Sequence, residues 1–345
     1  MIHGHGNDGY RYKRDIVADF SSNVWFEGTP DALLSHLQTG LPAISQYPEP
    51  DAESLKKKIA EKYNLRFNQC LVTNGSVEAF YLVAFAYSRA GSTIATPCFA
   101  EYEDACRIHG HKVDFLDNRQ EWENIDFENQ LLWIGNPNNP DGNIISLDTI
   151  RDMLCNNPET LFVIDEAYGE LCAEFQSAVP LIEDFSNILI IRSFTKSFAI
   201  PGLRLGYVLG SEKIIKKLEQ LKMPWTVNAL ALEAGLFILD NYDLLMPEIK
   251  KVKSASETFQ EELKEIGKHI TVIPSECNYF LVKLNGSYAS QLKEMLMEQY
   301  GILIRDASNF RGLDERFIRL AVQRPENNKL LIEALIKVLK VLDNG

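Results

Sequence analysis

The feature that most constrains the fold is an alternation between short apolar runs and helical patterns, which begins near residue 70. CLVTN (70–74) is typical of a buried strand, and SVEAFYLVAFAYSRA (76–90) has the spacing of a helix. STIATP (92–97) and AEYEDACRIHG (100–110) repeat this order, and four more apolar runs follow: QLLWIGNP, TLFVIDEA, NILIIRSF and LGYVLG. Such runs predict an α/β fold with a mostly parallel sheet covered on both faces.

The pattern changes after about residue 240, where a long charged helix is expected at 245–266. Short strands are then predicted by HITVIP, NYFLVKL, GILIRDA and FIRLAVQ, with helices near 288–299 and 326–342. A chain of 345 residues is also longer than one hydrophobic core usually supports. We therefore expect an N-terminal arm (1–30) packing on the small domain or the cleft, a large α/β domain (31–240) and a small C-terminal α+β domain (241–345).

Charge and cysteine usage argue against several classes of partner. The 35 basic and 48 acidic residues give a net charge of −13 without a basic stripe, so we expect no binding to nucleic acid or to a membrane. The N-terminus has no apolar signal-peptide core and no run approaches 18 apolar residues, which favours a cytoplasmic protein. The six cysteines are scattered as in reduced cytosolic proteins, and no metal site is expected.

Polar clusters follow the predicted strands directly. Because ligands of open α/β sheets bind outside the carboxyl ends of the strands, these clusters should share one rim: 74–76, 97–102, 136–142, 165–168 and 193–196. Lys196 belongs to the last cluster, within the largely apolar SFTKSFAIPGLRLGY. A lysine is rarely buried unless it is paired or chemically used. For Lys196 alone, a solvated lysine at the start of a helix is the simpler interpretation.

Two of the clusters could together bind an anion. In TNGS, Gly75 and Ser76 open a helix after a strand, and the first N–H groups of a helix attract phosphate. Taken alone, this motif is better interpreted as a capped turn. Ser193, Thr195 and Arg204 add two hydroxyls and a guanidinium, so that the five residues could form a phosphate cup.

Three further residues could serve a flat, cationic ring. Asp165 ends the run LFVID, where it is either a helix cap or the partner of a protonated ring nitrogen. Tyr102 could stack on such a ring, although an isolated tyrosine is more often packing material. Asn139 lies in the turn NPNNPDG and could point its amide at a ligand oxygen. None of these signals is specific alone, whereas their order around Lys196 is.

In that order and spacing the chain resembles, over nearly its whole length, the fold type I pyridoxal-phosphate (PLP) enzymes of the aspartate aminotransferase superfamily. Within them it is similar to the branch shared by L-threonine-O-3-phosphate decarboxylase and histidinol-phosphate aminotransferase. The resemblance implies PLP as cofactor and a homodimer with shared active sites. It implies the following roles: Lys196 as the Schiff-base lysine, Asp165 on the pyridine nitrogen, Gly75, Ser76, Ser193, Thr195 and Arg204 on the phosphate, Asn139 and Tyr168 on the ring hydroxyl, Tyr102 stacked on the ring, and Tyr47 at the neighbouring subunit's phosphate site.

The same resemblance implies how the substrate is bound. Arg319 in FIRLAV would bind the α-carboxylate, and Arg305 in GILIRDASNF a second anionic group, most simply a phosphate. Asn23 and the N-terminal HGHGN, with either His3 or His5, resemble substrate-side elements of the decarboxylase.

The sequence leaves two candidate reactions open, decarboxylation and transamination. MPWTVNALA and the segment 302–322 are closer to the decarboxylase, whereas Tyr168 fits the aminotransferase branch better. Residues 25–28 and Asp141 also depart from the usual residues of the branch. We expect decarboxylation of an O-phospho-amino acid such as L-threonine phosphate, with transamination of histidinol phosphate and 2-oxoglutarate as the alternative. A non-catalytic PLP-fold binding protein is less favoured, because Lys196 and Asp165 are both present.

Overall fold

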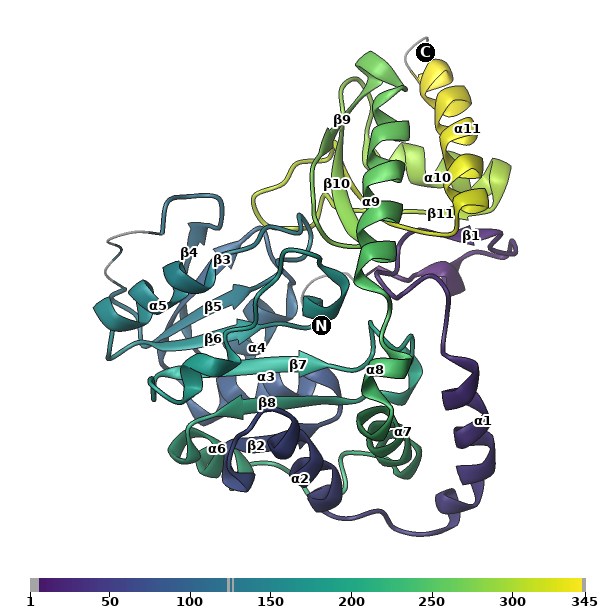
Figure 1. The fold of residues 1–345 in the computed structure, drawn as a ribbon. Coiled ribbons are helices and arrows are strands. Elements are labelled where there is room, and N and C mark those ends of the chain that lie inside the picture. The colour runs from purple at the N-terminus through teal and green to yellow at the C-terminus, as the bar shows by residue number, and fades with distance from the viewer. Residues whose placement is uncertain (1–5, 123–124, 126, 343–345) are drawn as a thin grey trace.

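The computed structural model describes residues 6–122, 125 and 127–342, and a seven-stranded sheet forms its larger part (Figure 1). The order is β2-β8-β7-β6-β5-β3-β4, and within the described sheet β8 alone runs in the direction opposite to the other strands. The strands are β2 (Cys70–Thr73), β3 (Gly91–Thr96), β4 (Lys112–Asp117), β5 (Leu131–Gly135), β6 (Leu161–Asp165), β7 (Ile188–Ser193) and β8 (Gly206–Gly210). The mostly parallel α/β fold predicted from the sequence is confirmed. The sequence pattern did not predict β4, because this half-exposed edge strand contains no apolar run.

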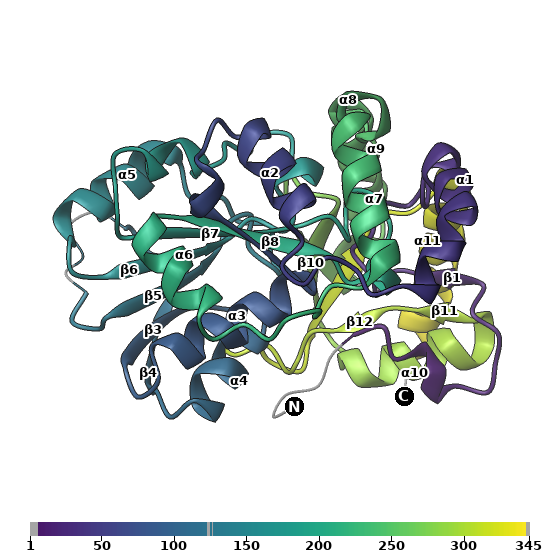
Figure 2. The same cartoon turned by 90° about the horizontal axis from the view of Figure 1, so that it is seen from below.

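Helices cover both faces of this sheet because neighbouring strand residues point to opposite sides. Trp133 and Ile134 of β5, for example, belong to two different buried clusters. Figure 2 shows α3 and α4 on one side and α2 and α5 on the other. The Trp133 side carries α3 (Gly75–Ala86), α4 (Glu101–Ile108) and α6 (Glu212–Glu219), and the Ile134 side carries α2 (Glu53–Lys62), α5 (Leu147–Asn156) and α7 (Ala229–Asp240). This double burial explains why the strands are apolar throughout.

The C-terminal part has a core of its own around a four-stranded antiparallel sheet, β12-β13-β10-β9. Its elements are α8 (Tyr242–Leu245), α9 (Ile249–Lys264), β9 (Ile270–Ile273), β10 (Tyr279–Leu284), α10 (Ala289–Tyr300), β11 (Ile302–Leu303), β12 (Arg305–Asp306), β13 (Phe317–Ala321) and α11 (Pro325–Leu342). The helix expected at 245–266 begins only at Ile249, because Pro247 cannot continue α8.

The N-terminal segment crosses between the two parts. β1 (Ala18–Asp19) pairs in parallel with β11, and Phe20 is buried in the C-terminal core. α1 (Asp31–Gly40) then contacts α7 (Figure 1). The domain limits near residues 30 and 240 remain predictions. None of the described helices has the length and apolarity that a bilayer span requires.

Candidate active site

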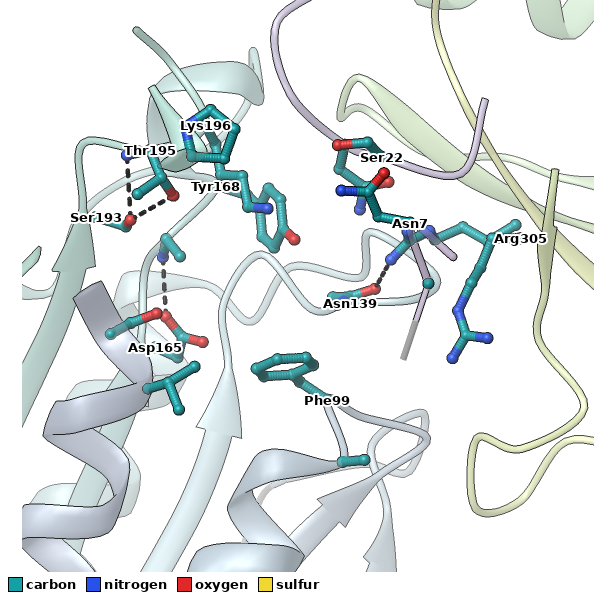
Figure 3. Close-up of a pocket in the computed structure, with 18 of the residues that line it drawn as sticks. Asn7, Ser22, Phe99, Asn139, Asp165, Tyr168, Ser193, Thr195, Lys196 and Arg305 are labelled. Atoms are coloured by element: carbon teal, nitrogen blue, oxygen red, sulfur yellow. Dashed lines mark hydrogen bonds between the residues drawn. The ribbon is translucent and has the colours of Figure 1, made fainter. Parts of the chain in front are cut away.

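A pocket lies where the carboxyl ends of β5, β6 and β7 face the C-terminal sheet (Figure 3). It contains residues from all five polar clusters that the sequence assigned to one rim, together with two arginines of the C-terminal part. Of the site residues expected from sequence, those that line it are Asn23, Ser76, Tyr102, Asn139, Asp165, Tyr168, Ser193, Thr195, Lys196, Arg204, Arg305 and Arg319. The loops after the strands, the N-terminal segment and the C-terminal sheet therefore all contribute residues to one pocket.

Lys196 faces this pocket instead of starting a helix. Residues 194–199 form turns and a bend after β7, and the lysine side chain is partly exposed between buried neighbours. Its Nζ lies 5.7 Å from the centre of the Tyr168 ring, and both side chains are seen together in Figure 3. The backbone N–H of Trp25 donates to the Lys196 carbonyl at 3.0 Å, which ties this loop to the N-terminal segment. Lys196 thus presents an amine to a defined cavity.

Asp165 ends β6 with a buried carboxylate. Its Oδ2 accepts a hydrogen bond from the Tyr102 hydroxyl at 2.6 Å, and its Oδ1 accepts one from the Ala167 N–H at 3.0 Å. Burial raises the pKa of Asp165 to about 6, against the opposing effect of these two donors. A ligand cation at this carboxylate would offset the cost of its burial.

The structure revises the stacking role expected for Tyr102. The Tyr102 ring is 3% exposed, stacks on Trp133 at 6.1 Å and meets Phe80 edge-on at 4.9 Å. Its position in the first turn of α4 directs the side chain back into this cluster. Phe99, in the loop just before α4, lines the pocket with its ring (Figure 3). Phe99 is therefore the better candidate to contact a flat ligand, and sequence reasoning missed it.

The residues expected to form a phosphate cup lie together at the N-terminus of α3. Gly75 has a φ of +76°, and a Cβ at this position would lie 2.5 Å from Nη2 of Arg204, so only glycine lets the guanidinium approach. The Ser193 and Thr195 hydroxyls are 2.8 Å apart, and Ser76 lines the same pocket. Hydroxyls, a guanidinium and the N–H groups of α3, a 12-residue helix, form a cradle for an anion.

Two arginines lie directly opposite each other at the other end of the pocket. Arg305 of β12 and Arg319 of β13 are register partners, and both are buried. Like charges in such a position destabilise a sheet. Burial lowers the pKa of both, for Arg305 to about 10 with the charge of Arg319 contributing. An arrangement that is costly for the fold favours a site for an anionic ligand.

The hydrogen bonds of these arginines leave some polar atoms unused. Arg319 donates to Asn139 Oδ1 and to the Ser21 carbonyl, each at 2.6 Å. Arg305 donates to Asn309 Oδ1 and to the Asp306 carbonyl, each at 2.7 Å. Within the described residues, Nε of Arg319 and both amide atoms of the buried Asn23 have no hydrogen-bond partner. This unused capacity would suit a polar ligand.

Asp141, one of the departures noted in the sequence, has a structural role. Its Oδ1 accepts hydrogen bonds from the Asn138 side chain at 2.7 Å and from the Asn143 N–H at 3.1 Å. The Asn118 side chain donates to Oδ2 at 3.3 Å. Asp141 therefore closes the loop that carries Asn139.

A buried ion network beneath the pocket fixes the ends of β6 and β7. Arg192, next to Ser193, donates to Glu166 at 2.6 Å and also pairs with Glu170. Glu166 further accepts from the Ala178 N–H at 2.7 Å. Glu166 follows Asp165 directly, and Arg192 lies four residues before Lys196. The network therefore fixes the position of the Asp165 loop relative to the Lys196 loop.

Three residues named from the sequence cannot be placed in this pocket. Tyr47 is 88% exposed, does not line it and has its ring 5.6 Å from that of Trp225. His3 and His5 lie outside the described residues.

Several solved structures are similar to this chain over most of its length. The L-threonine-O-3-phosphate decarboxylase from Porphyromonas gingivalis has a TM-score of 0.91 at 39% identity, covering 94% of this chain and 100% of that chain. The histidinol-phosphate aminotransferase from Clostridium acetobutylicum has a TM-score of 0.84 at 30% identity, covering 94% and 100%. The Sinorhizobium meliloti histidinol-phosphate aminotransferase, solved with pyridoxal-5'-phosphate, has a TM-score of 0.83, covering 96% and 94%, and its 22% identity supports the fold alone.

A family match extends over most of the sequence. The family described as "Aminotransferase class I and II" matches residues 16–335. The match includes the loops after β5, β6 and β7 and both opposed arginines. The chain is therefore an enzyme that belongs to the aminotransferase class I and II family.

Proposed function

We propose that this enzyme uses PLP to decarboxylate a phosphorylated amino acid, with L-threonine O-phosphate as the expected substrate. The observation that carries the proposal is the opposed pair Arg305 and Arg319, which offers two buried cations to one ligand. L-threonine O-phosphate has two matching anionic groups, a carboxylate and a phosphate. The similarity to the Porphyromonas gingivalis decarboxylase supports the same substrate class.

The residues of the pocket fit PLP. The cradle around Gly75 and Arg204 would hold its phosphate, Asp165 would pair with its pyridine nitrogen, and Phe99 would contact its ring. Asn139 and Tyr168 would donate to its ring hydroxyl oxygen, and Lys196 would attach it covalently. When bound, PLP supplies an electron sink for the bond broken at the substrate Cα.

The protein's own groups would then direct the reaction. Arg319 would bind the α-carboxylate and Arg305 the phosphate, so the substrate would be fixed at both ends. Lys196 would deliver a proton from its Nζ to the substrate Cα after loss of CO2. The orientation that Arg319 gives to the carboxylate would decide between decarboxylation and transamination.

CO2 release tests this proposal. Purified protein loaded with PLP is incubated with L-threonine O-phosphate without a keto acid. Steady release over many turnovers is expected. If no CO2 is released and histidinol phosphate reacts with 2-oxoglutarate, the chain is an aminotransferase. That second candidate is supported by Tyr168 and by the similarity to the Clostridium acetobutylicum enzyme.

Tyr102→Phe should weaken PLP binding about tenfold at pH 7, because a hydrogen bond to a charged group contributes about 1.5–3 kcal/mol. The Tyr102 hydroxyl lowers the pKa of Asp165, so its removal should raise this pKa further above its ordinary value. The loss of affinity should therefore grow as the pH falls from about 8 to about 6. The dissociation constant for PLP, measured across this range, is the readout.

Tyr81→Phe is the matched control for Tyr102→Phe. Its hydroxyl also donates to a carboxylate, Glu101 at 2.8 Å, but it does not line the pocket. This variant should bind PLP as the wild type does. Equal PLP affinity in both variants would show that Tyr102 does not act through Asp165.

We also propose a homodimer in which Tyr47 contributes to the neighbouring active site. Large apolar side chains are exposed on two segments, 41–47 and 223–225. The two segments are adjacent, because the ring centres of Tyr47 and Trp225 are 5.6 Å apart. Exposed apolar surface of this kind is typical of an interface.

Ile44→Asp should therefore give a monomer by light scattering, whereas Val341→Asp, at an exposed site on α11, should stay dimeric. A monomeric wild type would contradict the proposal.

A further inference from the structure

The loop between β12 and β13 reaches from the C-terminal sheet to the large sheet (Figure 1). Arg311 in this loop donates to both oxygens of Glu103 on α4, with Nε to Oε2 at 3.0 Å and Nη2 to Oε1 at 2.8 Å. Its guanidinium also lies 4.0 Å from the centre of the Phe115 ring on β4. Two elements of the large part therefore hold one side chain of the small part.

The Glu103 carboxylate is well suited to this role. Its side chain is 7% exposed, and Arg107 of the same helix donates to Oε1 at 2.6 Å. Burial would raise the pKa of Glu103, but the hydrogen bonds from Arg311 and Arg107 outweigh it and lower the pKa. A buried carboxylate with a two-point guanidinium partner is a strong and directional contact.

The residues just before Arg311 organise the substrate end of the pocket. Asn309 and Phe310 both line it, and Asn309 accepts a hydrogen bond from Arg305 at 2.7 Å. The Arg305 guanidinium lies 5.1 Å from the centre of the Phe310 ring. Arg311 does not line this pocket, so it acts on Arg305 only through the loop. Anchoring the loop at Arg311 fixes the two side chains that orient Arg305.

We propose that the contact between Arg311 and Glu103 is a latch that holds the loop 307–313 against the large part and positions Arg305 for the substrate phosphate. Arg311 is thus a positioning residue for phosphate specificity. The statement about phosphate rests on the proposed function. The latch itself does not, because it is a contact between the two parts of the chain.

The test compares Arg311→Met with Arg107→Met. Each variant removes one guanidinium from Glu103, but only the first releases the loop. Arg311→Met should raise KM for L-threonine O-phosphate about tenfold with little change in kcat. This is the effect expected if the misplaced Arg305 loses one charge-assisted contact with the substrate phosphate. KM for unphosphorylated L-threonine should not change. Arg311→Lys, which keeps the charge without the two-point geometry, should fall between the wild type and Arg311→Met.

Hydrogen exchange of the peptide that covers 307–313 gives a readout independent of substrate. Exchange should be faster in Arg311→Met and unchanged in Arg107→Met. Equal exchange and equal KM in the two variants would overturn the latch. If the wild type used neither substrate, the proposed function would fail, and faster exchange in Arg311→Met alone would still support the latch.

Discussion

Lys196→Ala should abolish turnover and leave a protein that binds PLP without a covalent bond. The amine would serve both as the attachment point and as the proton carrier, so a fall of about 10⁴-fold or more is expected. Borohydride reduction followed by mass spectrometry should find the pyridoxyl group on the peptide that contains residue 196 in the wild type. In the variant, no peptide should carry this mass.

A second half-buried lysine provides the control. Lys222 donates to the Met223 carbonyl and does not line the pocket. Lys222→Ala should keep both the covalent label and the activity. If Lys196→Ala retained turnover, or if the label were found on another lysine, the assignment of this pocket as the PLP site would fail.

The positions of Asp165 and Lys196 could be predicted because each follows a short apolar run. Such a run is a buried strand, and the carboxyl ends of parallel strands meet at one edge of the sheet. The pocket therefore contains residues from every polar cluster that followed a predicted strand. β4 was not predicted, because this half-exposed edge strand contains no apolar run.

The choice between Phe99 and Tyr102 could not be made from the sequence. The two aromatic residues are three positions apart and both line the pocket, but which one presents its ring to a ligand depends on where α4 begins. A shift of one or two residues in a helix start lies within the error of any sequence pattern. The latch shows a different limit, because Arg311 and Glu103 are 208 positions apart and no local pattern connects them.

The charge of the site is opposite in sign to the net charge of the chain. The chain has a net charge of −13, yet Arg305 and Arg319 lie opposite each other in a buried sheet. Their mutual repulsion is part of the reason that the pKa of Arg305 falls to about 10. At neutral pH both guanidiniums still carry their charge. A dianionic substrate would neutralise both, and such selection is what the proposed function expects of this pair.

Arg305→Ala should lower kcat/KM for L-threonine O-phosphate about 100-fold, because a guanidinium can make two charge-assisted contacts of about 1.5 kcal/mol each with a phosphate. The value of kcat/KM for unphosphorylated L-threonine should change less than about twofold. The protein should not lose thermal stability, because the substitution also removes the repulsion of Arg319. Arg316→Ala is the matched control: this partly exposed arginine pairs with Asp314 in the loop between β12 and β13 and does not line the pocket. An equal loss for both substrates would mean that Arg305 supports the common amino acid portion and does not recognise phosphate.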